Sequence, residues 1–355
     1  MRVLIVVPDM VLGGVTTVVT NLLKQLYVLK DDVMIVSLKT IELKNIYGFK
    51  IESLNIKNKV NFLMSSRKFA KIIKDFNPDI IHSHTIYPHL IVRLAKILHF
   101  HNIKHVCSEH TTIDSSKGFV WYLFKVTNKY SDLVTFVSRY SANSYIENDL
   151  IDKNKLKILY NGVDCNYYHR ESINIVCDNF KFAYIGRLSK EKNLLNLLQA
   201  IDIIKNKVDF KLYIVGDGEQ KQELLNYLKF NDLLDKIEFL GSKSDIKPVL
   251  EEIDLLLISS DTEGLPMIIL EAMSMQCNIV STECGGIPEI FENLPNFLAK
   301  INDPEELALQ ILNNIMLSEN QRNNIGLLYR ERILDRFSVD RYKNEIVSIY
   351  KSLIS

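Results

Sequence analysis

Residues 253–267 read Ile253-Asp-Leu-Leu-Leu-Ile-Ser-Ser-Asp-Thr-Glu-Gly-Leu-Pro-Met267. This stretch begins with an almost continuous apolar run, which is typical of a strand that is buried on both faces of a parallel sheet. The polar turn that follows contains Gly264, and Pro266 favours the start of a helix at Met267. The sequence therefore predicts a strand, a loop and a helix in that order.

The same alternation runs through all 355 residues. Parallel sheets covered by helices give this pattern, and the length fits two domains of roughly 150 residues each. We therefore predict an α/β chain with two doubly wound domains, residues 1–166 and about 180–339, and a linker at 167–179. The predicted strands cover residues 2–7, 33–37, 79–83, 104–108 and 132–137 in the first half, and 181–185, 210–215, 237–240, 253–258 and 278–280 in the second.

Composition excludes several classes of protein. No apolar run approaches the roughly 18 residues that a membrane span needs, and the chain start reads as a strand rather than a signal peptide, so a cytoplasmic location is expected. The five cysteines show no C-x-x-C pair, which argues against a zinc ribbon or a disulfide framework. Residues 1–166 hold 22 Lys and Arg against 14 Asp and Glu, and the rest hold 21 against 29, so the first half favours an anionic partner.

Two loops at predicted strand ends carry features that suit an anion. Gly13 and Gly14 open the helix predicted for residues 16–26, where bare backbone can approach a phosphate, although a plain turn is the alternative. Arg187 and Lys192 follow the first strand of the second half and can both reach one phosphate cluster. The alternative for this loop is a solvated cap on the next helix.

Glu263 and Glu271 stand eight positions apart, and Glu271 falls within the apolar helix that begins at Met267. A buried carboxylate without a partner is costly, so Glu271 requires a hydroxyl or a cation. An internal Lys or Arg is the simpler alternative. The free amides around Leu265 and Met267 point toward the crevice expected at the carboxyl ends of the strands, and they can receive an anion.

Two histidines and a basic segment are further candidate sites. His82 and His84 share one face of a strand as metal ligands do, but no third ligand has a suitable spacing, so we expect no metal and expect His84 to line the crevice at the strand ends. The segment Lys57–Lys74 holds six cations and no acid. It is an ordinary surface helix or a docking site for anionic lipid. Because aromatic residues do not interleave with these cations, nucleic acid is not an expected partner.

Together these motifs resemble the retaining glycosyltransferases of family 4, which have the GT-B fold. The resemblance implies two Rossmann-like domains that face each other across a cleft, with a C-terminal helix that crosses back, so that about 340–355 join residues 1–166. It is carried, in the family's order, by Gly13-Gly14, Glu109-His110, Asn161-Gly-Val-Asp164, Gly186-Arg-Leu-Ser-Lys-Glu-Lys192, the E-x7-E pair Glu263 and Glu271, and Gly285-Gly-Ile-Pro-Glu289.

The resemblance also implies a role for each site residue. Arg187 and Lys192 would bind the donor diphosphate in place of a metal ion. Glu271 would accept hydrogen bonds from the ribose, Glu263 would contact the transferred sugar, and His110 would contact the donor sugar or its phosphate. The other implied donor-binding residues are Gly13, Gly14, Leu240, Ser242, Gly264, Leu265, Pro266 and Met267.

The activity that this resemblance implies is retaining transfer of a hexose, without a cofactor, from a nucleotide diphosphate sugar to a glycan or lipid-linked acceptor. Family frequency favours a UDP-linked donor, a role in surface polysaccharide synthesis of the O-antigen or capsule type, and a position in the cytoplasm or on the inner face of the cell membrane. Two alternatives remain open. One is a sugar-nucleotide 2-epimerase of the same fold, and the other is a non-catalytic subunit that binds a sugar nucleotide.

Overall fold

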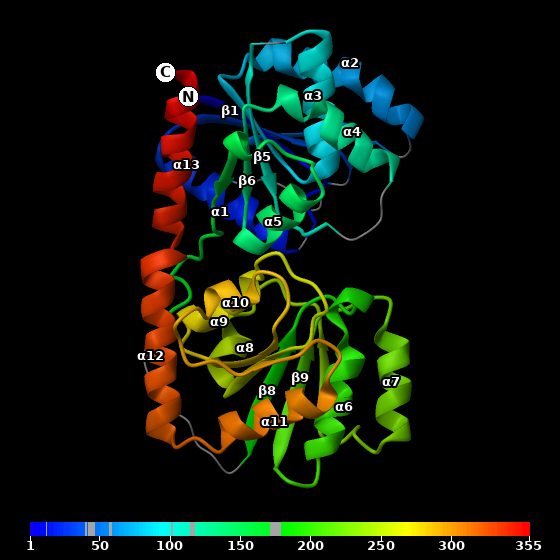
Figure 1. Cartoon of the computed structure of the whole chain (residues 1–355), viewed down its shortest axis with the longest axis vertical. Helices are drawn as coiled ribbons and strands as arrows, with labels where there is room; N and C mark the ends of the chain where they lie inside the picture. Colours follow the sequence, from blue (N-terminus) through cyan, green and yellow to red (C-terminus); the bar gives the residue numbers. More distant parts are fainter. Residues whose placement is uncertain are drawn as a thin grey trace. The chain divides into compact units, whose positions relative to one another are not determined.

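The computed structural model describes residues 1–11, 13–39, 41, 47–56, 59–100, 102–113, 118–170 and 179–355. The chain forms two compact units, shown with their elements in Figure 1. Unit 1 consists of Met1–Gly162 and Val339–Ser355, and unit 2 of Val163–Ser338. Residues 171–178 of the predicted linker lie outside the described residues, and so does Cys177.

The core of unit 1 is a parallel sheet of seven strands in the order β3-β2-β1-β4-β5-β6-β7. Every residue from Val3 to Val7 is buried, as expected for a central strand that is covered on both faces. The strands are β1 Arg2–Val7, β2 Asp32–Ser37, β3 Lys50–Ser53, β4 Ile80–His84, β5 Lys104–Glu109, β6 Leu133–Phe136 and β7 Leu156–Ile158.

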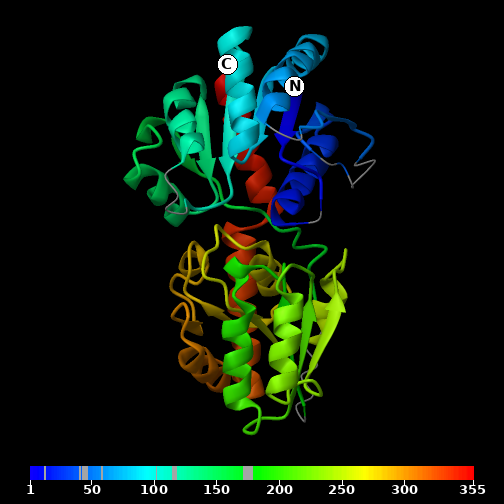
Figure 2. The same cartoon turned by 90° about the vertical axis from the view of Figure 1, so that its right-hand side faces the viewer.

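Helices lie on both faces of this sheet (Figure 2). They are α1 Gly14–Val28, α2 Lys59–Phe76, α3 Ile86–Leu98, α4 Phe119–Thr127, α5 Arg139–Glu147 and α13 Val339–Ile354. The helices α2, α3 and α4 pack side by side in that order, and α1 packs against β2 and α13. A hydrogen bond of 2.6 Å between His82 Nδ1 and the Tyr350 hydroxyl joins α13 to β4. The predicted return of the C-terminal helix to the first domain is thus confirmed.

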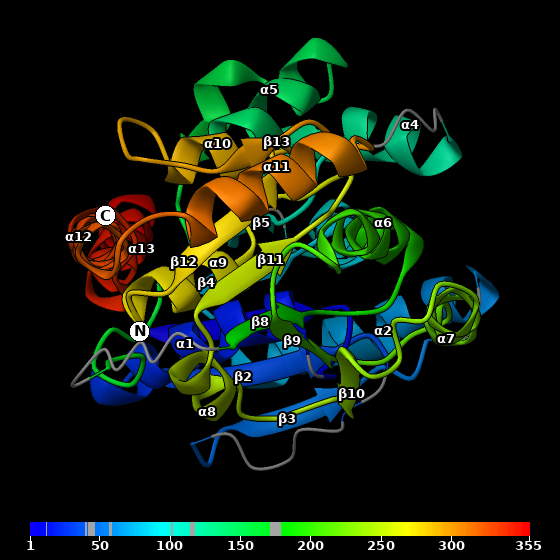
Figure 3. The same ribbon diagram turned by 90° about the horizontal axis from the view of Figure 1, so that it is seen from below.

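Unit 2 repeats the same design with a parallel sheet of six strands in the order β10-β9-β8-β11-β12-β13. The strands are β8 Phe180–Ile185, β9 Phe210–Val215, β10 Ile237–Gly241, β11 Leu255–Ile258, β12 Asn278–Thr282 and β13 Leu298–Ala299. One face is covered by α6, α7 and α11, and the other by α9 and α12 (Figure 3). The helices are α6 Leu194–Ile204, α7 Lys221–Phe230, α8 Lys247–Glu252, α9 Met267–Ser274, α10 Ile287–Ile290, α11 Pro304–Ile315 and α12 Glu319–Arg336.

Each of the ten predicted strands is present, with ends shifted by up to two residues, and the α/β class is confirmed. The strands β3, β7 and β13 are not among the predicted ones. All three are short strands at sheet edges, and most of their residues are only partly buried. An edge strand lacks the continuous apolar run of a central strand, so its sequence resembles that of a loop.

The basic segment, for which a surface helix and a lipid site were both considered, forms most of α2, and Lys57 lies outside the described residues. Its apolar residues Phe69, Ile72 and Ile73 are buried in the core of unit 1. Between residues 65 and 74, the side chains that are exposed are therefore all charged, for example that of Lys71. In the part of the chain that the structure describes, no helix is both long enough and apolar enough to cross a bilayer.

Candidate active site

The candidate site of unit 2 lies at the carboxyl ends of β8 and β11, which are neighbours in the sheet. Along the chain, β8 is followed by β9 and β10, which lie on one side of it in the sheet. The next strand, β11, lies on the other side of β8. Such a switch point leaves a crevice beyond the strand ends, where open α/β sheets bind ligands. The loop after β8 carries Arg187 and Lys192, and the loop after β11 carries Glu263.

The structure brings Lys192 and Glu263 together across 71 positions of the chain. Lys192 Nζ donates to Glu263 Oε1 at 2.5 Å, and the Ser260 hydroxyl donates to the same oxygen at 2.7 Å. The Glu263 side chain is 10% exposed and that of Lys192 is 24% exposed. The pair is therefore partly shielded from water. Charge-assisted hydrogen bonds are stronger in such surroundings than on an open surface.

Hydrogen bonds between the two loops fix the position of Lys192. The Ser259 hydroxyl donates to the Lys192 carbonyl at 3.0 Å, and the Asp261 amide donates to the Glu191 carbonyl at 2.9 Å. Asn193, in the left-handed conformation with φ 45°, donates its side-chain amide to Asp261 at 2.7 Å. The backbone that carries this cation is thus held in place before any ligand arrives.

A third loop, after β12, supports Glu263 from its backbone side. The Gly286 amide donates to the Glu263 carbonyl at 3.3 Å, and Gly285 has a left-handed φ of 57°. A Cβ atom on Gly285 would lie 1.7 Å from the Glu263 carbonyl oxygen. The glycine pair of the Gly285–Glu289 motif therefore lets this loop approach the Glu263 loop closely.

Replacement of Gly285 with alanine is expected to destabilise unit 2 by about 2–4 kcal/mol, because the new Cβ strains the backbone and clashes with a carbonyl. Thermal unfolding of the full chain measures the loss. Gly14→Ala is the matched control, since a Cβ there meets nothing within 4 Å. Equal melting temperatures for the two variants would contradict the expected close approach.

Glu271 lies on the second turn of α9 and is only 5% exposed. Burial raises the pKa of its carboxyl to about 7, against a smaller opposing effect of the hydrogen bond from Tyr168. The alternative of a Lys or Arg partner is not what the structure shows, because the interacting group is the Tyr168 hydroxyl. A hydroxyl donor is also what a ribose would supply.

The remaining predicted residues of unit 2 lie farther from the pair of Lys192 and Glu263. Arg187 is 67% exposed and pairs with Glu191 of its own loop. Pro266 caps α9 without a side-chain hydrogen bond, so the helix start can offer backbone amides to an anion. Leu240 and Ser242 lie at the end of β10, two strands away from β8. Gly264, Leu265 and Met267 form the turn into α9.

In unit 1 the predicted residues also follow the strands at a switch point, which here lies between β1 and β4. Gly13 and Gly14 are exposed after β1, and internal packing does not require glycine at either position, because a Cβ would meet nothing within 4 Å. His84 ends β4 and His110 follows β5, and His84 Nδ1 lies 2.9 Å from His110 Nε2. Burial lowers the pKa of both imidazoles, that of His110 to about 3, so both are neutral at pH 7.

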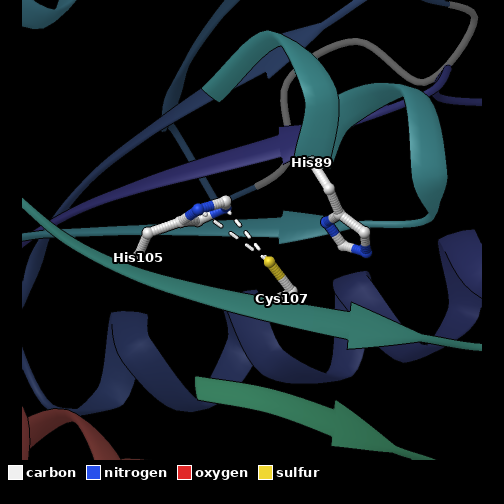
Figure 4. Close-up of side chains that lie close together, drawn as sticks. All are labelled: His89, His105 and Cys107. Atoms are coloured by element: carbon white, nitrogen blue, oxygen red, sulfur yellow. Dashed lines mark hydrogen bonds between the residues drawn. The ribbon is translucent and has the colours of Figure 1, made fainter. Parts of the chain in front are cut away.

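A buried cluster of metal-binding residue types lies elsewhere in unit 1. The ligand atoms of His89, His105 and Cys107 all lie within 4.8 Å of one another (Figure 4). However, the Ser83 hydroxyl lies 2.6 Å from His89 Nδ1 and 2.7 Å from His105 Nε2, and the Arg93 guanidinium lies 3.8 Å from Cys107 Sγ. A cation beside the thiol disfavours a metal ion, so the donor set fits a hydrogen-bonded core better than a metal centre.

Sequence reasoning missed Tyr168, Ser260 and Glu191, which partner Glu271, Glu263 and Arg187. Ser260 and Glu191 stand within loops that the motifs already marked, so their proximity was available as a signal. Tyr168 lies about 100 residues before its partner, in a segment that the sequence analysis assigned to the linker, and nothing in the sequence connected the two.

Comparisons with known proteins identify the family of the chain. Residues 12–167 match the family described as Glycosyltransferase Family 4, and residues 168–327 match Glycosyl transferases group 1. N-acetyl-alpha-D-glucosaminyl L-malate synthase of Bacillus anthracis is 27% identical over 82% of this chain and 79% of its own length. A UDP-Gal:alpha-D-GlcNAc-diphosphoundecaprenol alpha-1,3-galactosyltransferase of Escherichia coli is 25% identical over 80% and 78%.

Solved structures share the fold. The crystal structure of Anabaena Alr3699/HepE in complex with UDP superposes with a TM-score of 0.86 at 20% identity, covering 99% of this chain and 100% of that one. The two family matches meet at residues 167 and 168 and together cover most of the chain. With its two Rossmann-type sheets, this chain belongs to the GT-B glycosyltransferases of group 1 and family 4.

Proposed function

We propose that this glycosyltransferase moves a sugar from a UDP-linked donor to a glycan or lipid-linked acceptor, with retention of configuration and without a metal ion. The observation that carries the proposal is the pair of Lys192 and Glu263 at the strand switch point of unit 2. Glu263 lies on the loop that leads into α9, the helix with the buried Glu271. One cation and two carboxylates in this order suit the phosphate, the sugar and the ribose of one ligand.

The choice of donor and acceptor is supported by relatives. The Anabaena protein named above has also been solved in complex with UDP-glucose. The Escherichia coli relative is named for a UDP-galactose donor and a diphosphoundecaprenol-linked acceptor. Other relatives are named for O-antigen and capsular polysaccharide biosynthesis. We therefore place this chain in surface polysaccharide assembly.

In the proposed reaction, Lys192 and Arg187 hold the donor diphosphate and stabilise the charge that grows on it as the sugar leaves. Lys192 is already fixed by its loop, whereas Arg187 must exchange Glu191 for phosphate. The start of α9 adds backbone amides to the same anion. We assign Gly13 and Gly14 to the diphosphate as well, since bare backbone leaves room for it.

We assign Glu263 to a hydroxyl of the transferred sugar rather than to nucleophilic attack. Lys192 and Ser260 both donate hydrogen bonds to Oε1 of its side chain. The Lys192 ammonium stabilises the negative charge of the carboxylate and so makes it a weaker nucleophile. A same-face substitution then fits better. The bond from the anomeric carbon to the phosphate oxygen breaks, a bond to the acceptor oxygen forms, and the acceptor proton passes to the departing phosphate.

His110 is assigned to the donor sugar or its phosphate, and His84 to the acceptor side. Because both rings are neutral, one nitrogen of each donates and the other accepts. In the hydrogen bond between His84 Nδ1 and His110 Nε2, one ring nitrogen donates and the other accepts, so the tautomer of one ring determines that of the other. His84 therefore orients His110.

The experiment that tests the function is incubation of the purified protein with a panel of nucleotide sugars, with and without a bacterial membrane extract. Release of UDP that depends on the extract, with an α-linked product from an α-linked donor by NMR, is the expected result. Conversion of the donor to a 2-epimer without acceptor would instead identify an epimerase. Binding without turnover of any donor would identify a non-catalytic subunit.

Transfer is expected to continue unchanged in the presence of EDTA, because Lys192 and Arg187 supply the charge that a divalent cation would otherwise provide. The rate is measured on protein that has been dialysed against the chelator. Loss of activity that Mg²⁺ or Mn²⁺ restores would contradict the metal-free mechanism.

A further inference from the structure

The motif Asn161–Asp164 carries part of the family resemblance, but the proposed reaction gives it no role. It lies where the chain passes from one unit to the other, because unit 1 ends at Gly162 and unit 2 begins at Val163. The Val163 amide donates to the Phe337 carbonyl at 2.9 Å, just after the end of α12. The chain therefore enters unit 2 along this helix.

The segment that follows forms a turn that leads to Tyr168, the partner of Glu271. The Tyr168 amide donates to the Asp164 carbonyl at 2.9 Å. The Asp164 side chain accepts from the amides of Asn166 and Tyr167, each at 3.2 Å. Such a side chain fixes the course of a turn, so the last residue of the motif sets the path by which Tyr168 reaches α9.

One guanidinium, that of Arg330 on α12, connects this turn to α9. It donates to the carbonyls of Cys165 and Tyr168 at 3.2 and 3.0 Å, and also to the Ser274 carbonyl. The Ser274 hydroxyl donates to the same Tyr168 carbonyl at 2.7 Å. Carbonyls in turns and at the end of a helix have no helical partner, and a planar group with several N–H donors can satisfy them together.

The same guanidinium acts on both sides of the hydrogen bond between Tyr168 and Glu271. Ser274 ends α9 and lies three positions after Glu271, on the same face of the helix. Arg330 thus holds the backbone of the tyrosine and the last turn of the helix that carries the glutamate. The 18-residue helix α12 packs against α9 and is a rigid support for these contacts.

We propose that Arg330 is a positioning residue for the carboxylate that is assigned to the ribose. It fixes the Tyr168 backbone against the end of α9, so that the Tyr168 hydroxyl is held at Glu271 before a ligand arrives. Contacts of this kind, one layer behind a binding residue, keep that residue in its productive geometry. The inference rests on the proposed role of Glu271 in binding UDP, so one arm of its test uses no ligand.

The arm without ligand is the titration of the Glu271 carboxyl, followed by ¹³C NMR with labelled glutamate and assigned from its absence in Glu271→Gln. Besides burial, the group that acts on this carboxyl is the Tyr168 hydroxyl, which also faces Tyr167 and Asp245. The wild-type midpoint is expected at about 7. Arg330→Gln should raise it by about 0.5–1 pH unit, because a less firmly held hydroxyl stabilises the carboxylate less.

The second arm is the affinity for UDP, measured by calorimetry. If the carboxylate binds the ribose, a midpoint raised by this amount lowers the ionised fraction at pH 7. The affinity of Arg330→Gln at pH 7 should therefore be about two- to fivefold below that of the wild type. At pH values well above both midpoints the difference should shrink.

Three further variants distinguish positioning from a direct effect of the Arg330 charge. Arg330→Lys keeps the charge, but one ammonium does not reproduce the planar fork, so its midpoint should also rise. Ser274→Ala changes no charge and removes the hydroxyl that donates to the Tyr168 carbonyl, so it should raise the midpoint as well. In Tyr168→Phe, which lacks the hydroxyl already, adding Arg330→Gln should cause no further rise.

Arg332→Gln is the matched control on the same helix. Arg332 donates to the carbonyls of Ile290 and Glu292 at 3.4 and 2.7 Å, so its replacement also removes contacts to backbone carbonyls of unit 2. It should lower the melting temperature and leave the Glu271 midpoint where it is in the wild type.

An unchanged midpoint in Arg330→Gln would overturn the inference, and so would a further rise when this change is added to Tyr168→Phe. If Arg330→Gln does not fold, unchanged midpoints in Arg330→Lys and Ser274→Ala overturn it instead. Midpoints that rise as expected while UDP affinity stays independent of pH would support Arg330 as the residue that positions Tyr168. The same result would contradict the assignment of Glu271 to the ribose, so the two failures are distinguishable.

Discussion

Replacement of Lys192 with alanine is expected to lower kcat for sugar transfer by about 10²–10³-fold, because one positioned donor to the leaving diphosphate is removed. The effect should appear in kcat more than in KM, since the diphosphate gains charge only as the sugar departs. The measurement is steady-state transfer, with the acceptor that the donor panel identifies.

The matched control is Lys190→Ala, which removes an exposed cation from the same loop. It should keep wild-type kcat, because charge near the loop is not enough without the position that Ser259 and Asp261 give to Lys192. Lys192→Ala also leaves Glu263 with Ser260 alone, so a lower melting temperature is expected and folding is verified by circular dichroism. Full activity of Lys192→Ala in metal-free buffer would refute the mechanism.

The positions of the central strands along the chain could be predicted from the sequence, because strands buried on both faces are continuous apolar runs. The run that becomes β11 is the clearest example. The same reasoning could not find β13, whose two residues gain their strand character only from pairing with β12. Edge strands depend on tertiary context, which a local pattern does not contain.

The site divides in the same way. The sequence located Glu263 and Lys192 on loops at strand ends, but their direct contact depends on the order of β8 and β11 in the sheet. That order brings together residues from distant parts of the chain. The environment of Glu271 was anticipated as buried, yet its partner Tyr168 could not be predicted, because the pairing requires side-chain packing across about 100 residues.

Glu271→Gln is expected to make the protein more stable and less able to bind its donor. Burial raises the pKa of Glu271 in the folded state to about 7, above its ordinary value of 4.5. The folded protein therefore holds more protons than the unfolded chain between pH 4.5 and 7, and wild-type stability falls as pH rises through this window. Above pH 7 the full cost of about 3–4 kcal/mol is present, and glutamine removes it.

Chemical unfolding of both proteins between pH 4.5 and 8 measures this difference. The gain in the free energy of unfolding should be largest at pH 8 and should vanish near pH 4.5, where the wild-type carboxyl is also neutral. Glu252→Gln, at an exposed position of the same unit, is the matched control and should show no such gain. A variant that is less stable than the wild type at pH 8 would contradict the raised pKa.

The same substitution should weaken UDP binding by about tenfold or more, since hydrogen bonds to a charged acceptor are worth about 1.5–3 kcal/mol.

In the wild type, UDP affinity should rise as pH increases through about 7, because only the carboxylate accepts from both ribose hydroxyls. In Glu271→Gln this rise should disappear. Tyr168→Phe should shift the rise to higher pH, since the hydrogen bond that lowers the pKa of Glu271 is lost. Calorimetric titration with UDP at several pH values distinguishes these cases. A buried charge that lowers stability is explained most simply by the binding of a ligand, and equal UDP affinity in the wild type and Glu271→Gln would remove that explanation.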